Sequence, residues 1–126
     1  MEEVIRKLKF KSEVVVINAP LDLEKKFVRP GFSKTFKVSV KSTNTLVFIN
    51  NLKEFMDFLR SDLEFVEPDS ILWFAYPKGS SGIKTDIHRD ILRMAGAQFG
   101  LSTVAAISIN DTWSALRFRP VEKVGK

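Results

Sequence analysis

The 126-residue sequence contains no cysteine and a single histidine. Without cysteine there is no thiol nucleophile, no thiolate metal site and no disulfide. One histidine, with no pair of carboxylates at close spacing, supplies neither a catalytic triad nor a set of metal ligands. We therefore predict no metal site and a non-enzymatic protein. His88, in the first turn of a predicted helix, is interpreted as a surface residue.

Long apolar runs are also missing. The longest, residues 71–77, is far shorter than the ~20 residues with which a helix crosses a membrane. Residues 1–11 carry charges throughout and lack the apolar core of a signal peptide. These absences predict a soluble, cytoplasmic protein that does not contact a membrane.

Charge is unevenly distributed along the chain. Residues 1–41 hold ten Lys/Arg against five acids, residues 42–70 two against six, and residues 71–126 eight against four. A basic region can attract nucleic acid or an anionic ligand, or it can be a lysine-rich surface in solvent. The solvated surface is the favoured interpretation, because the chain lacks a helix-turn-helix signature and the aromatic platform of single-strand binders. A nucleic-acid-binding module that uses the basic N-terminal region is kept as an alternative.

Four short apolar runs do not alternate with polar residues, which is typical of strands covered on both faces. They are residues 14–17, 46–49, 71–76 and 104–109. Apolar residues at steps of three and four predict helices over 52–66 and 86–99, and a third helix over 21–27. Asn51 is the expected N-cap of the first of these, and Thr85 or Asp86 that of the second.

The order of strands and helices predicts parallel strands joined by crossovers. The turn Asn110-Asp111-Thr112 is so tight that the strand after it, residues 113–119, is expected to run antiparallel to its neighbour. We predict one α/β domain over residues 1–126. It has three layers, with a mostly parallel sheet flanked by helices and an antiparallel last strand.

Two interpretations remain open for residues 35–41. Their apolar residues alternate with lysines and a serine, which suits a half-exposed edge strand. Only residues 42–44 separate them from the next strand, which permits a hairpin but not a parallel crossover. The alternative is an extended arm.

The segment "YPKGSSGIKTD", residues 76–86, follows the third predicted strand. Ligands of parallel α/β sheets bind outside the carboxyl ends of the strands. Gly79 and Gly82 can take positive φ and expose backbone N–H groups, and the start of the next helix adds partial positive charge. The segment lacks the ending and spacing of a Walker loop. It is a candidate anion cradle, or else a plain turn in which Asp86 already satisfies the helix terminus.

The candidate ligand-binding residues at this edge are Lys78, Ser80, Ser81, Lys84, Asp111 and Trp113. The first four would contact an anionic small molecule, and the last two would line the far side. Trp113 has an alternative role as a plug at the edge of the core. Arg117 and Arg119 share one face of the last strand and are expected either to be exposed or to pair with the acidic region 54–69.

These motifs together resemble a bacterial family of small α/β proteins of unknown function. The resemblance rests on Tyr76-Pro77-Lys78, Ser80-Ser81, Thr85-Asp86, Arg89-Asp90 and the run from Asp111 to Arg117. It implies an α/β fold and no assigned activity, so it brings no cofactor, partner or catalytic residue. The closing pattern of strands is also similar to the C-terminal half of Rossmann-like methyltransferases. Those enzymes hold their cofactor with a glycine-rich loop after the first strand, where this chain has Asn18-Ala19-Pro20. A degenerate methyltransferase-like enzyme is therefore a further alternative.

Overall fold

The computed structural model describes residues 2–27, 31–37 and 39–124. Its helices are α1 (Glu2–Leu8), α2 (Leu21–Phe27), α3 (Leu52–Ser61) and α4 (Arg89–Ala97). Its strands are β1 (Val14–Ile17), β2 (Phe32–Ser33), β3 (Ser42–Phe48), β4 (Val66–Pro77), β5 (Leu101–Ser108) and β6 (Trp113–Pro120). Short 3₁₀ helices lie at η1 (Leu63–Phe65), η2 (Gly79–Ser81) and η3 (Val121–Lys123).

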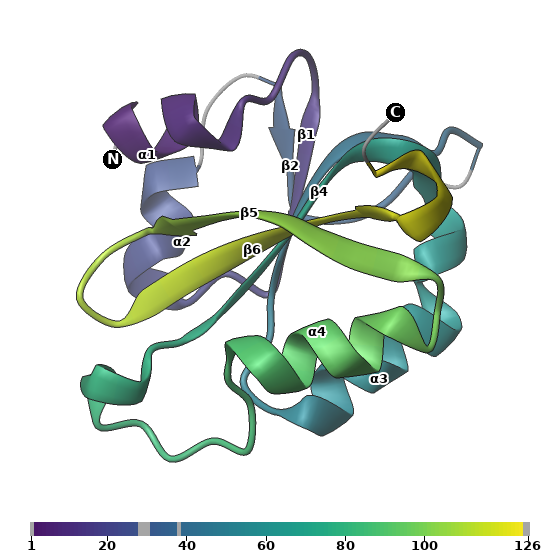
Figure 1. Cartoon of the computed structure of the whole chain (residues 1–126). Helices are drawn as coiled ribbons and strands as arrows, with labels where there is room; N and C mark the ends of the chain where they lie inside the picture. The colour runs from purple at the N-terminus through teal and green to yellow at the C-terminus, as the bar shows by residue number, and fades with distance from the viewer. Residues whose placement is uncertain (1, 28–30, 38, 125–126) are drawn as a thin grey trace.

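The strands form one mixed sheet in the order β2-β1-β3-β4-β6-β5 (Figure 1). The pairs among β2, β1, β3 and β4 are parallel, and β6 is antiparallel to both β4 and β5. The predicted mostly parallel sheet with antiparallel pairing at its C-terminal end is therefore confirmed. β5 runs in the same direction as β4, so both strands end at the same edge of the sheet.

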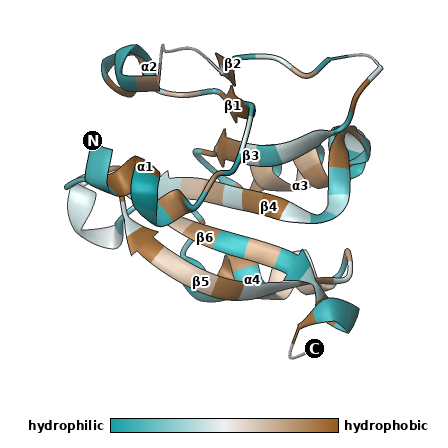
Figure 2. Cartoon of the chain, turned by 90° about the horizontal axis from the view of Figure 1, so that it is seen from above, coloured by the Kyte–Doolittle hydropathy of each residue, from teal (hydrophilic) through white to brown (hydrophobic). Residues whose placement is uncertain are grey.

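Side chains of successive strand residues enter two separate cores. In β4, Leu72 and Phe74 pack with α3 and α4, whereas Ile71 and Trp73 pack on the side of α1 and α2. Figure 1 shows the two pairs of helices on opposite sides of the sheet. Helices therefore cover both faces of β4, which explains why its sequence does not alternate. In Figure 2 the charged bands of β6 interrupt its apolar residues.

The prediction that residues 104–109 form a strand covered on both faces is wrong. Among the described strands, β5 is the last of the sheet and pairs only with β6. Val104 is 38% exposed, and Ala105 and Ala106 are exposed too. Alanine exposes little apolar surface to water. A run that contains two alanines therefore looks apolar in the sequence, although helices do not have to cover both faces of the strand.

Of the two interpretations left open for residues 35–41, the described residues agree with the arm, because none of them lies in a strand. Phe36 anchors the arm by stacking on Phe65, with ring centroids 5.5 Å apart. Lys37 forms an exposed ion pair with Glu13 at 3.0 Å. Residue 38 lies outside the described residues, and Val40 is 62% exposed.

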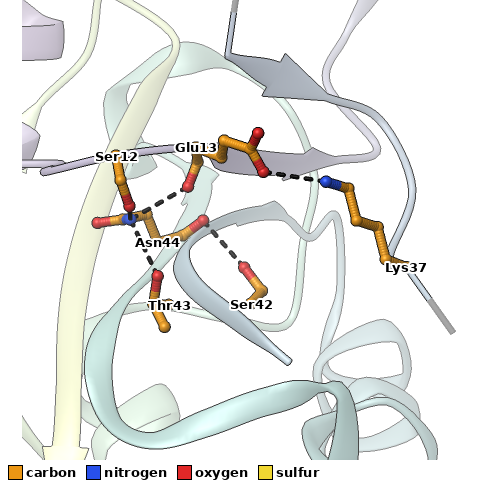
Figure 3. A network of polar contacts seen from close by, with 6 residues as sticks. All are labelled: Ser12, Glu13, Lys37, Ser42, Thr43 and Asn44. Carbon is orange, nitrogen blue, oxygen red and sulfur yellow. Dashed lines mark hydrogen bonds and ion pairs between the residues drawn. The ribbon is translucent and has the colours of Figure 1, made fainter. Parts of the chain in front are cut away.

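Residues 42–44, which precede the strand predicted over 46–49, instead begin β3. Asn44 is only 2% exposed, and its Nδ2 donates hydrogen bonds to Ser12 Oγ and the Glu13 carbonyl, both at 3.1 Å (Figure 3). Its Oδ1 accepts a hydrogen bond from the backbone N–H of Lys11 at 3.1 Å. This buried amide ties the segment before β1 to the start of β3, and it extends the strand into a region where the sequence is polar.

Two of the three predicted helices differ from the observed helices at their ends. The helix over 21–27 is confirmed as α2. The helix over 52–66 ends at Ser61, and its last predicted residues belong instead to η1 and to the start of β4. The helix over 86–99 begins only at Arg89. α1 and the two-residue strand β2 were not predicted. Among the described residues, no helix is long and apolar enough to span a membrane.

Candidate functional site

The loop after β4, residues 78–88, meets the β5–β6 turn at the carboxyl edge of the sheet. Two hydrogen bonds of Lys78 form this junction. Its backbone N–H donates to the Thr112 carbonyl at 2.7 Å, and its Nζ donates to Ser108 Oγ at 2.6 Å. The two sequence segments chosen as candidates are therefore adjacent in space. Ser108 was not among the predicted site residues, although its place at the end of a strand could have indicated it.

Hydrogen bonds inside the loop hold its first half in shape. The Ser81 hydroxyl donates to the Lys78 carbonyl at 2.7 Å and accepts from the Ile83 N–H at 3.2 Å. Gly82 takes φ +84°, a left-handed conformation that glycine adopts at low cost. Gly79 does not have a positive φ, so only one of the two glycines adopts the predicted conformation.

The second half of the loop is fastened to the start of α3. The Thr85 hydroxyl donates to the Asn50 carbonyl at 2.6 Å, and Asp86 Oδ1 accepts from the Leu52 N–H at 2.8 Å. The expectation that Thr85 or Asp86 caps the following helix is therefore wrong. α4 begins three residues after Asp86, and its N-cap, His88, makes no side-chain cap hydrogen bond.

Carboxylates already occupy the N-terminus of α3. Besides Asp86, Glu54 Oε1 accepts from the Asn50 N–H at 2.9 Å. The predicted N-cap is confirmed, because Asn51 Oδ1 accepts from the Glu54 N–H at 2.9 Å. These contacts satisfy two of the free N–H groups of the first turn, those of Leu52 and Glu54. An anionic ligand at this edge would therefore depend on side chains rather than on this helix terminus.

The β5–β6 turn is organised by Asn110. Its Oδ1 accepts hydrogen bonds from the N–H groups of Thr112 at 2.9 Å and Trp113 at 2.8 Å. Trp113 is only 6% exposed, and its ring packs edge-on against Phe48 with centroids 5.2 Å apart. This burial matches the alternative role of Trp113 as a plug of the core.

Three candidate side chains remain open to solvent. Ser80, Lys84 and Asp111 are exposed, and within the described residues their side chains make no hydrogen bond or ion pair. The candidates fall into two groups. Lys78 and Ser81 lie with the β5–β6 turn, whereas Lys84 precedes the residues that contact α3.

Tyr76 adds a group that sequence reasoning did not select. It lies one residue before the end of β4, on the face that packs with α3 and α4. Burial raises the pKa of the Tyr76 hydroxyl, and the nearby charge of Arg89 acts in the opposite direction. The hydroxyl therefore stays protonated at neutral pH and is a potential hydrogen-bond donor. Among the residues that the structure describes, no three His, Asp or Glu side chains form a metal-binding group.

Some cations of the basic N-terminal region are paired. Lys34 forms an ion pair with Glu24, Lys37 with Glu13, and Lys7 lies 3.8 Å from Glu3. These pairs reduce the charge that the first part of the chain offers to a polyanion.

Of the two arginines expected to be exposed or to pair with the acidic region, one pairs with it. Arg119 Nε donates to Asp69 Oδ1 at 2.8 Å, and its Nη2 donates to Oδ2 at 3.2 Å. Arg117 has a buried Nε that makes no hydrogen bond within the described residues.

No family model and no curated protein matches the chain. The fold is similar to a solved structure described as a pericyclic reaction enzyme, with TM-score 0.53, 12% identity and 94% of this chain covered. It is also similar to a SAM-dependent methyltransferase from Aquifex aeolicus, with TM-score 0.51, 11% identity and 93% of this chain covered. The chain spans 39% of the pericyclic enzyme and 87% of the methyltransferase. At these identities the comparison establishes the fold alone, and it agrees with the distant methyltransferase-like topology predicted from the strands.

Proposed function

We propose that this protein is a non-catalytic binding domain that holds an anionic small molecule at the carboxyl edge of its sheet. Lys78, Ser80, Ser81 and Lys84 contact the anion, and Asp111 borders the far side, with Trp113 buried behind it as part of the core. The observation that carries this proposal is the junction made by Lys78, whose two hydrogen bonds join the loop to the β5–β6 turn.

The loop is suited to binding because its shape is fixed by hydrogen bonds within the chain. Ser81, Thr85 and Asp86 each bond to backbone groups, so little conformational entropy is lost when a ligand binds. Lys84 contributes an unpaired ammonium group, and Lys78 retains donors beyond its bond to Ser108. The exposed carboxylate of Asp111 repels a second negative charge, which favours a ligand with one anionic end and a polar, uncharged remainder.

The same contacts argue against catalysis. The Ser81 hydroxyl donates to a carbonyl rather than to a general base, and His88 is exposed. A nucleophile needs a base within hydrogen-bond reach. None of the described hydrogen bonds of this edge joins a hydroxyl to a histidine or to a carboxylate.

A thermal-shift panel of nucleotides and phosphorylated metabolites tests the proposal. At least one compound is expected to raise the melting temperature of the wild type, and Lys84→Ala and Lys78→Ala should abolish that rise. Lys7→Ala removes the same charge from α1 and should leave the rise intact. Failure of every compound, or an equal rise in all three variants, would contradict the proposal.

The fold favours a second candidate, an enzyme of methyltransferase ancestry that has lost its activity. In α/β sheets ligands bind where the strand order reverses, which here is between β1 and β3. The turn after β1 does not fit a glycine-rich cofactor loop. Asn18 takes φ +61°, and Pro20 has no N–H to donate. Calorimetry with S-adenosylmethionine is expected to give no saturable heat. A saturable heat of binding would favour the methyltransferase-like candidate instead.

A further inference from the structure

A cavity of about 650 Å³ lies at the opposite end of the sheet from the candidate anion site. It opens where the end of α3, the start of β4, the α4–β5 connection and the end of β6 come together. These segments lie at the amino edge of the parallel strands. The cavity is therefore separate from the loop at residues 78–88, and its function does not depend on the function proposed above.

The floor of the cavity is apolar. Leu59, Leu72, Leu101 and Phe118 line it, each at most 8% exposed, and all belong to the core between the sheet and α3/α4. The half-buried Leu63 forms part of the wall. Small-molecule sites typically have volumes of about 300–1,000 Å³ and mostly apolar linings. The size and the floor of this cavity both meet that description.

Irregular backbone gives the cavity a fixed mouth. Ser42 of β3 lies opposite Val66, but Asn44 lies opposite Ile71, so residues 67–70 bulge out of β4. The bulge is held by the two hydrogen bonds between Arg119 and Asp69, whose φ is +57°. On the other side the Val121 N–H donates to the Gly100 carbonyl at 2.8 Å. Both sides of the mouth are thus tied within the chain, as in a preformed site.

The rim is acidic although the chain as a whole carries a net charge of +5. Glu64, Glu67 and Glu122 line the cavity, and within the described residues none of them makes an ion pair. Lys41 and Arg60 are the cations of the lining. The fourth carboxylate, Asp69, is neutralised by Arg119. Among the side chains that line the cavity, the three unpaired carboxylates outnumber the two cations, with Lys123 also acting on Asp69 from beside the rim. The lining therefore attracts an amine more than a carboxylate.

We propose that this cavity is a second binding site, for a small molecule with an apolar body and a cationic amine. The apolar body contacts the leucines and Phe118 of the floor. The amine remains at the mouth beside Glu67 and Glu122. A neutral ligand of the same shape binds less tightly, and an acid binds least tightly.

Amide NMR titration with three matched probes tests this site. The probes are 4-phenylbutylamine, 4-phenylbutanol and 4-phenylbutyrate, which share an apolar body and differ in the charge of their end group. Saturable shifts are expected at the amides of Gly100, Leu101 and Ser70, with affinity falling in the order amine, alcohol, acid. Absence of saturable shifts at these amides with any probe, or an acid that binds as tightly as the amine, would overturn the proposal.

Two variants separate the apolar and the charged contributions. Leu63→Trp fills the cavity and should weaken the binding of all three probes at least tenfold, whereas Met94→Trp on the exposed face of α4 should not. Equal weakening by the two tryptophans would overturn the site. The double variant Glu67→Gln/Glu122→Gln alters exposed side chains, so its folding is not at risk. It should retain the binding of the alcohol and lose the preference for the amine; an unchanged preference would also count against the proposal.

Discussion

The carboxylate of Asp86 accepts a hydrogen bond from the backbone N–H of Leu52 at 2.8 Å. The bond joins the loop after β4 to the first residue of α3, two segments that are 34 positions apart in the sequence. With the Thr85–Asn50 bond, it fixes the loop against the carboxyl edge of the sheet. The rigidity of the candidate site depends on this relationship.

Removal of the Asp86 carboxylate should therefore loosen both segments. Asp86→Ala is expected to lower the free energy of unfolding by about 1 kcal/mol, the usual effect of losing a side-chain bond to a helix N-terminus. Urea denaturation measures the loss. Asp111→Ala, an exposed carboxylate with no described partner, is the matched control and should change stability by less than about 0.5 kcal/mol. Equal effects of the two variants would show that the Asp86 bond does not stabilise the fold.

The buried amide of Asn44 should be among the polar side chains that matter most for stability. Asn44→Ala leaves the Lys11 N–H and the Glu13 carbonyl without a partner in a partly buried region. We expect a loss of about 2–4 kcal/mol, since each unsatisfied buried group costs about 1–3 kcal/mol. Asn50→Ala, at an exposed position, should cost far less in the same urea titration. A small loss for Asn44→Ala would mean that water replaces its contacts.

Arg117 should lower stability rather than contribute to it. Its Nε is buried, and within the described residues it has no hydrogen-bond partner. Methionine has a similar length and no polar donor, so Arg117→Met is expected to raise the free energy of unfolding by about 1 kcal/mol. Arg93→Met on the exposed surface of α4 is the control and should be nearly neutral. A destabilised Arg117→Met variant would indicate that the guanidinium has a partner in solution.

The ion pair at the mouth of the cavity predicts a dependence on pH. Hydrogen bonds from Arg119 hold the pKa of Asp69 below its ordinary value of 3.8. The stabilisation is therefore fully present above that value and is lost as the pH falls through the lower pKa of the folded state. A ¹³C NMR titration should place the midpoint of the Asp69 carboxyl group below 3.8, and Arg119→Gln should return it to the ordinary range. The same midpoint in both proteins would exclude the pair.

Much of the sheet could be predicted because buried parallel strands have a simple signature. The apolar runs of β1, β3 and β4 and the tight turn before β6 determine the main strands and the antiparallel ending. β2 has only two residues and no pattern to detect. β5 was misjudged because its run of valine and alanines does not reveal that the strand lies at the edge.

Strand direction predicted that the candidate segments are adjacent, but not which contacts their residues make. The loop and the β5–β6 turn do lie together, as strand direction predicts. The partners of Asp86 and Thr85 could not be predicted, because they lie in a distant segment, and local spacing suggested a cap on the next helix instead. Asn44 was left outside the predicted strands for the same reason: its partners are more than thirty residues away. Periodicity carries no information about contacts of this kind.

The most direct test of the proposed anion site is an amide NMR titration with glycerol 3-phosphate, which has one anionic end and a polar, uncharged remainder. An anion site at this edge predicts saturable shifts at the amides of Gly79, Gly82, Lys84 and Thr112, and their loss in the double variant Lys78→Ala/Lys84→Ala. Amides of residues 6–41 should move little. The absence of saturable shifts at the loop, or shifts spread over the basic N-terminal region and unchanged in the double variant, would contradict it.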